Sequence, residues 1–152
     1  MTGRPATSRP PYASMLIALD ESPRAPAEAG TDLARLTGAQ VFLVRVVTEP
    51  TDIPPAAHTM PDRLRPDVER AVRSEFQRLM NTAPDVQFAA PLVVEGDPWR
   101  RIIEIGKQLD VDVVVMGSHR THGIERVLGT VASRVVNHAD RSVLVVRGRT
   151  PL

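Results

Sequence analysis

Short apolar runs alternate along the chain with longer segments in which apolar residues recur every three or four positions. The runs are residues 15–19, 41–47, 88–94, 111–116 and 142–147. Runs of this length, rich in Val, Ile and Leu, are typical of strands that are buried on both faces. The segments between them have the period of amphipathic helices. We therefore expect five strands, with helices over residues 23–37, 62–81, 99–109 and 130–138.

The first helix carries a start signal and a stop signal. Ser22 is the expected N-cap, Pro23 the first helical residue, and Gly38 the residue that ends the helix. Its buried face is expected to hold Ala29, Leu33 and Leu36.

Helical spacing predicts the buried face of the second helix, and a start signal marks the beginning of the third. In the second, apolar residues at helical spacing predict the buried face: Leu64, Val68, Val72, Phe76 and Leu79. In the third, Asp97 is the expected N-cap and Pro98 the first helical residue.

Strands that alternate with helices predict a three-layer, doubly wound, Rossmann-like α/β domain with a parallel sheet. Right-handed crossovers place the helices on both faces of such a sheet. Ligands then bind beyond the carboxyl ends of the strands, where the strand order reverses. Asp20 and Gly117 follow or close two such strands, so their surroundings are the first place to look for a site.

Composition narrows the function. The 152 residues include no Cys, 3 Phe, 1 Trp and 1 Tyr, and the net charge is +1. These values argue against disulfides, thiol chemistry and nucleic-acid binding. No apolar run reaches the ~20 residues of a membrane span. We expect a cytoplasmic protein with a flexible tail at residues 1–11 and one domain at residues 12–149.

The segment between the fourth strand and the last helix is rich in glycine. Gly117, Gly123 and Gly129 lie there with two hydroxyl residues, Ser118 and Thr130. Glycines let backbone amides approach an anion, and a helix N-terminus favours negative charge, so the segment suits phosphate. A plain structural turn would use glycine as well, and spacing alone leaves both readings open.

Several of these segments resemble the universal stress protein family. The resemblance is carried by MLIALDES from Met15, by GSH from Gly117, by GIERVLGT from Gly123, by VASRVVNHAD from Val131 and by SVLVVR from Ser142. It implies a five-stranded sheet in the order 3-2-1-4-5. The ATP-binding branch of the family carries Gly-x-x-Gly, about nine residues, then Gly and Ser or Thr. Here Arg120 replaces the second glycine, and the spacer is one residue shorter.

Residue by residue, the resemblance implies a nucleotide site. Ala18, Asp20 and Val46 would line the adenine and ribose pocket, beside Met116. Gly123 would shape the loop, and the Arg120 guanidinium would contact phosphate or narrow the cradle. The phosphates would be held by Gly117, Ser118, Gly129, Thr130 and Val131.

The function implied is that of a regulator rather than an enzyme, with slow ATP hydrolysis left open. Its ligand would be ATP or another adenine nucleotide with Mg²⁺, and residues 142–147 would pair in a homodimer. The alternative is a nucleotide-free dimeric interaction protein of the same fold, and Arg120 is the residue that separates the two hypotheses.

Other chemistries have weaker support. Asp20 and Glu21 form a generic carboxylate pair for Mg²⁺. His119 and His122 lack the ligand spacing of a zinc site, and Ser118 lacks the Gly-x-Ser-x-Gly setting of a hydrolase. A phosphoacceptor domain would need an Asp directly after the third strand and a Lys after the fifth. The sequence has neither.

Overall fold

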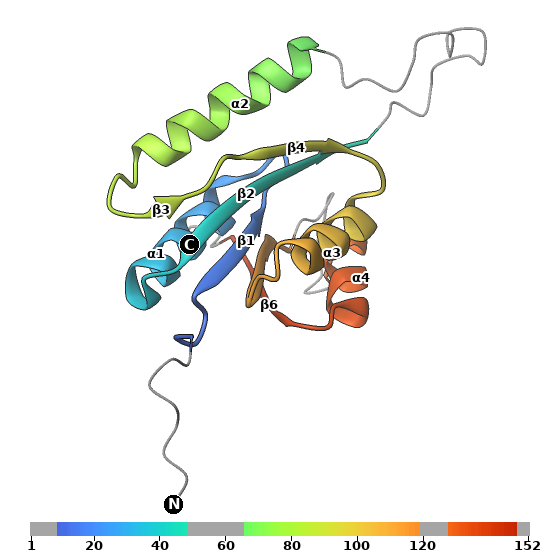
Figure 1. Cartoon of the computed structure of the whole chain (residues 1–152). Coiled ribbons are helices and arrows are strands. Elements are labelled where there is room, and N and C mark those ends of the chain that lie inside the picture. The colour runs from blue at the N-terminus through green and yellow to red at the C-terminus, as the bar shows by residue number, and fades with distance from the viewer. Residues whose placement is uncertain (1–8, 49–65, 119–127, 149–152) are drawn as a thin grey trace, which may run out of the picture.

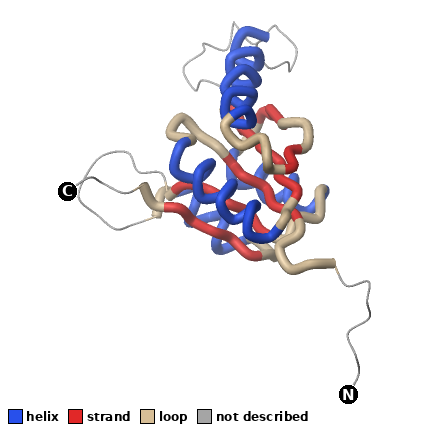
Figure 2. The backbone as a smooth tube through the Cα atoms, turned by 90° about the vertical axis from the view of Figure 1, so that its left-hand side faces the viewer, coloured by secondary structure: helices blue, strands red, loops and turns tan. Residues whose placement is uncertain are grey.

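A computed structural model describes residues 9–48, 66–118 and 128–148 of the chain. A parallel sheet lies between two layers of helices (Figures 1 and 2). The strands are β1 Ser14–Ala18, β2 Gln40–Val47, β3 Gln87–Phe88, β4 Leu92–Glu95, β5 Val113–Gly117 and β6 Ser142–Val146. The helices are α1 Arg24–Thr37, α2 Pro66–Asn81, α3 Pro98–Gln108 and α4 Thr130–His138.

The strands follow the order β3-β2-β1-β5-β6, and β4 also pairs with β2. Since β3 and β4 together take the place of the expected third strand, this is the doubly wound α/β order implied by the resemblance. Ala18 of β1 pairs with Val44 of β2 on one side and with Met116 of β5 on the other. The strand order therefore reverses between β1 and β5, at the point where the sequence placed Asp20 and Gly117.

Each face of the sheet has its own buried cluster. Helices α1 and α2 cover Met15, Ile17 and Leu43, and Phe76 of α2 is fully buried among them. Helices α3 and α4 cover the opposite face (Figure 1). Its cluster includes Leu16, Ala18, Val44, Val114 and Met116. No helix in the described ranges is long and apolar enough to span a membrane.

The structure corrects the start of the first helix. Pro23 occupies the N-cap position, α1 begins at Arg24, and no side chain caps its first turn. Ser22 is therefore not the N-cap. It lies in a turn before the helix, where its backbone N–H donates to the Asp20 side chain. Gly38 does end α1, with a left-handed φ of 69° that suits glycine. The expected ends of the last helix, 130 and 138, are confirmed.

The prediction for the buried face of α1 was also partly wrong. Leu36 is 85% exposed, and the buried residues of the helix are Pro26, Ala27, Gly30 and Ala34. A Cβ on Gly30 would lie 2.4 Å from Cδ1 of Ile17. Helix α1 thus lies so close to the sheet that only small residues fit between them, and periodicity alone does not reveal this distance.

The expected third strand is divided into two pieces. Ala89 still donates its N–H to the carbonyl of Val41 at 2.9 Å, but the chain then leaves the ladder before β4. Pro91 has no N–H to give to a neighbouring strand, and its carbonyl accepts a hydrogen bond from Arg73 of α2 at 3.2 Å. The edge of the sheet is therefore interrupted here.

The predicted buried face of α2 is confirmed over the described residues: Val72 and Phe76 are buried, and Val68 and Leu79 pack against the same cluster. Leu64 lies outside the described residues.

Candidate functional site at the carboxyl edge

Strands β1 and β5 end side by side, and the residues that follow them form the centre of the candidate site. Ala18 and Met116 are register partners, so Asp20 and Ser118 each lie two residues beyond a paired position. Val46 lies near the carboxyl end of β2, the other neighbour of β1. The topology therefore brings together strand ends that are far apart in the sequence.

Asp20 shapes the turn that leads from β1 into α1. Its Oδ1 accepts a hydrogen bond from the backbone N–H of Ser22 at 2.8 Å. Such a turn is a local substitute for a backbone hydrogen bond and holds the carboxylate in a fixed direction. Asp20 is half-buried and Glu21 is exposed, so the two adjacent carboxylates occupy different environments.

Backbone hydrogen bonds close the base of the glycine-rich loop. The N–H of Ser118 donates to the carbonyl of Val146 at 3.0 Å, and the N–H of Gly129 donates to the carbonyl of Ser118 at 3.1 Å. The two ends of the loop are thereby joined at the end of β5. Arg120 and Gly123, like His119 and His122, lie outside the described residues.

Helix α4 begins at this closed base and presents its N-terminus there. Gly129 is the N-cap, with φ −59° and ψ 160°, and makes no side-chain cap hydrogen bond. Thr130 is exposed, and the first turn contains no acidic residue. The first N–H groups of a helix have no partner within the helix, and its dipole favours an anion at this end. The local geometry therefore suits a negatively charged group.

Four of the expected site residues contribute to the apolar cluster under α3 and α4. Ala18 and Met116 are buried, and Val46 and Val131 are partly buried beside the same cluster. The structure thus places Ala18, Asp20, Val46, Met116, Gly117, Ser118, Gly129, Thr130 and Val131 on neighbouring strand ends and on the first turn of α4.

Sequence reasoning gave Gly96 only a turn, but this residue also joins two strand ends. It donates its N–H to the carbonyl of Val47 at 3.2 Å, with a φ of 134°. A Cβ at this position would lie 2.9 Å from Cγ of Arg101, whose side chain packs against it. The dipeptide Gly96-Asp97 before a proline was the only signal in the sequence.

The carboxylates whose pKa values shift lie at the other edge of the sheet, where the strands begin. A hydrogen bond from Arg35 lowers the pKa of Asp85, which lies two residues before β3. A hydrogen bond from Arg141 likewise lowers the pKa of Asp140, which lies just before β6. Both groups are exposed; the Asp85 pair links the end of α1 to the turn before β3, and the Asp140 pair joins adjacent residues before β6.

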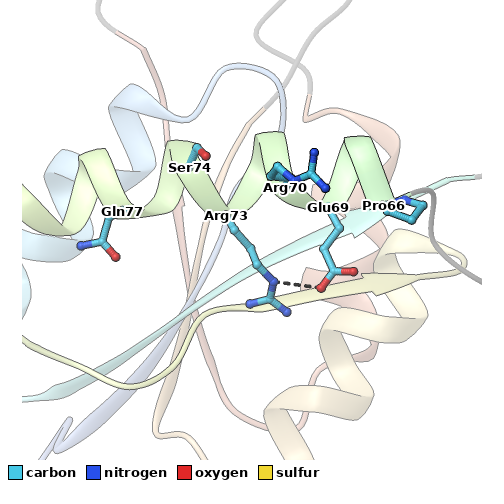
Figure 3. A pocket seen from close by; sticks show the side chains of 6 residues that line it. All are labelled: Pro66, Glu69, Arg70, Arg73, Ser74 and Gln77. Atoms are coloured by element: carbon cyan, nitrogen blue, oxygen red, sulfur yellow. Dashed lines mark hydrogen bonds and ion pairs between the residues drawn. The ribbon is translucent and has the colours of Figure 1, made fainter.

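A shallow hollow of about 430 Å³ runs along α2 (Figure 3). Its described lining comes from this one helix, on which Arg73 pairs with Glu69 at 2.9 Å. None of the residues singled out in the sequence as a binding site lines it, so it adds nothing to the carboxyl-edge site.

The sequence of the chain is similar to that of one protein family over almost its whole length. The profile of the Universal stress protein family matches residues 11–147. Universal stress protein A homolog 2 of Coxiella burnetii is 30% identical over 142 residues, which cover 90% of this chain and 95% of that protein.

Solved structures share the fold. The structure of protein MJ0577 has a TM-score of 0.77 at 23% identity and covers 93% of this chain and 99% of its own. A universal stress protein from Archaeoglobus fulgidus in complex with dAMP has a TM-score of 0.66 at 16% identity, with 90% and 98% covered. A further universal stress protein structure, in complex with cAMP, has a TM-score of 0.65 at 21% identity and covers 90% of this chain and 97% of its own.

Proposed function

The chain belongs to the universal stress protein family, and from this premise we propose that it is a regulatory protein that binds ATP or another adenine nucleotide at the carboxyl edge of its sheet. The observation that carries the proposal is the hydrogen bond between Gly129 and Ser118, which brings the N-terminus of α4 to the end of β5. This arrangement suits a phosphate group. The dAMP and cAMP of the two relatives contain the same base as ATP.

In the proposed complex, each group of the nucleotide meets a matching group of the protein. The adenine contacts the apolar side chains of Ala18, Val46 and Met116, and Asp20 accepts a hydrogen bond from a ribose hydroxyl. As the family pattern implies, Gly123 shapes the loop, and the Arg120 guanidinium contacts phosphate. The phosphates are held by Gly117, Ser118, Gly129, Thr130 and Val131.

Mg²⁺ fits this arrangement without a dedicated cage. This ion keeps several waters and binds through one or two carboxylates together with the phosphates of its ligand. Asp20, which is half-buried, and Glu21, which is exposed, supply two carboxylates at the carboxyl edge of the sheet. No group of three possible metal ligands occurs among the described residues.

Isothermal titration with ATP and Mg²⁺ tests the proposal. We expect saturable binding by the wild type and a loss of affinity of at least about tenfold in Gly129→Val, because a branched side chain at the N-cap blocks the approach of phosphate. Gly148→Val is the matched control, since a Cβ at Gly148 meets nothing within 4 Å. Equal affinity in all three proteins would refute the site.

Arg120→Gly separates the two functions that the sequence left open. It restores the second glycine of the family pattern. If the wild type shows no heat at about millimolar ATP while Arg120→Gly binds, the protein is a nucleotide-free interaction protein. If both bind, Arg120 is tolerated in the phosphate loop. Release of inorganic phosphate over hours, measured in the same samples, tests the non-enzymatic assignment.

We also expect a homodimer that pairs through β6. This strand forms one edge of the sheet, and Leu144 on it is 38% exposed. An uncovered apolar edge strand is a template for pairing with another chain. Light scattering at about 50 µM should give twice the mass of one chain, since stable homodimers usually bind far more tightly than this.

The absence of Cys suits the reducing cytoplasm, where we expect the protein to act.

A further inference from the structure

Helices α3 and α4 carry a cluster of basic side chains around the single tryptophan of the chain. Trp99 lies in the first turn of α3, and the guanidinium carbon of Arg100 is 5.2 Å from the centre of its ring system. The guanidinium carbon of Arg134 on α4 is 5.7 Å from it. The ring of His138 lies 4.8 Å away, centre to centre, at an interplanar angle of 42°. We name these four residues the Trp99 surface.

The Trp99 surface is accessible and carries excess positive charge. The side chain of Arg100 is 67% exposed and, among the described carboxylates, pairs with that of Asp97 at 3.6 Å. Arg134 and His138 are also exposed. Within the described ranges, no carboxylate lies at ion-pair distance from Arg134, whose guanidinium group lies over the indole ring. Asp97 therefore offsets one of the two guanidinium charges.

The geometry favours a particular kind of ligand. Cations already lie over the indole ring, so the ring is a poor platform for stacking a nucleobase. The guanidinium groups keep planar sets of N–H donors that match carboxylates. The Nδ1–H of His138 donates to the carbonyl of Arg134 at 2.8 Å, so this donor is already used within α4, and the donors left for a ligand are those of the two guanidinium groups. Two helices thus hold several donors around one apolar centre.

We propose that the Trp99 surface is a docking site for an acidic segment of a partner protein, with Asp or Glu carboxylates bound between Arg100 and Arg134. Charge complementarity identifies the partner. Arg and Trp are also the residues that most often dominate the binding energy of protein interfaces. The proposal does not depend on nucleotide binding, and it gives a regulator of this family a defined surface for its target.

The only tryptophan of the chain lies inside the proposed site, so its fluorescence reports on binding there. The full-length protein, without nucleotide, is titrated with a synthetic peptide of alternating Glu and Gly, and with the same peptide carrying Gln in place of Glu. We expect a saturable change in emission with the Glu peptide alone. The affinity should fall as salt is added, because exposed charges are screened.

Two variants locate the site. Arg134→Gln alone, and together with Arg100→Gln, should weaken binding of the Glu peptide, by at least about tenfold in the double variant. Arg78→Gln is the matched control, because Arg78 is an exposed arginine on α2. Circular dichroism checks that each variant is folded, and the single variant keeps the test decisive if the double variant unfolds.

Three outcomes would overturn the proposal. The first is no saturable response to the Glu peptide, in emission or in parallel calorimetry, up to about millimolar concentration. The second is equal affinity in the wild type and the Arg134→Gln variant. The third is tighter binding of a single-stranded DNA oligonucleotide of equal charge, which would assign the surface to nucleic acid.

Discussion

At the amino edge of the sheet, where the strands begin, side chains join the turns, whereas at the carboxyl edge the three helix starts that the structure describes with their N-caps, those of α1, α3 and α4, have no side-chain cap. The carboxylate of Asp112 accepts the N–H of Ser14 at 3.1 Å. Arg141 donates to the carbonyls of Gly106 and Val111 at 2.7 and 2.8 Å. Arg35 pairs with Asp85 at 2.8 Å. These contacts secure the entries to β1, β5, β6 and β3.

The carboxyl edge leaves its polar backbone open. The N-cap residues of α1, α3 and α4 are Pro23, Asp97 and Gly129, and none of them makes a side-chain cap hydrogen bond. Replacing a capping residue costs roughly 0.5–2 kcal/mol of stability when the replacement is alanine and about a few tenths when it is glycine. The two edges therefore differ in what their polar groups do: at one edge they join turns, and at the other they leave backbone donors available for the nucleotide that we propose.

Arg141→Met should have the largest effect, and only on stability. Arg141 is largely buried, with 15% of its side chain exposed, and the substitution leaves the carbonyls of Gly106 and Val111 without this donor. We expect a loss of about 1–3 kcal/mol in the free energy of unfolding, measured by urea denaturation, and no change in ATP affinity.

Arg78→Met is the control for this experiment, because it removes the same charge from an exposed position on α2. If Arg141→Met were as stable as the control, or if it weakened ATP binding, the division of tasks between the two edges would be wrong.

Gly129→Ser should have a smaller effect and change both properties in opposite directions. The backbone of Gly129 already has the extended conformation of an N-cap, so the serine hydroxyl can bond to the first turn of α4. We expect a gain of roughly a few tenths of a kcal/mol in stability. ATP affinity should fall severalfold, because the hydroxyl takes a donor that the phosphate would use. A more stable protein with unchanged affinity would show that these N–H groups do not bind the ligand.

The ion pair of Arg35 with Asp85 should produce the smallest effect, visible only in acid. The Arg35 hydrogen bond lowers the pKa of Asp85 in the native state, so the pair stabilises the protein above the unfolded pKa of about 3.9. This contribution is lost as the pH falls through the lower native pKa. The stability difference between the wild type and Arg35→Gln should therefore shrink from about pH 5 to about pH 2, in urea denaturation. A constant difference would mean that the pair contributes nothing.

Much of the fold could be predicted because local signals and the hydrophobic period agree. Helix α4 has the predicted bounds, since Gly129 and the apolar positions of the helix point to the same start. The buried face of α1 could not be predicted, because periodicity does not show that Gly30 lies against Ile17. The break near Pro91 was also missed, although a proline inside a strand pattern points to an edge strand.

The position of the candidate site at the carboxyl edge could be predicted from the topology. The contacts within it could not. Asp20 and Gly117 end apolar runs, and parallel strands bring such ends to one edge. The turn in which Asp20 binds the N–H of Ser22 depends on backbone angles that the sequence does not specify. The Trp99 surface could not be foreseen either, because it needs the packing of α3 on α4 to bring Trp99 beside His138.

The interruption at Pro91 has a consequence for self-assembly. One border of the sheet ends in β3 and β4, which have two and four residues, and the opposite border is the continuous five-residue strand β6. Copies joined through β6 use the same border in both partners, and such an isologous contact closes on itself. Within the described residues, no second continuous border remains for a third copy, so under the pairing that we propose the assembly would end at a dimer and would not grow into a fibre.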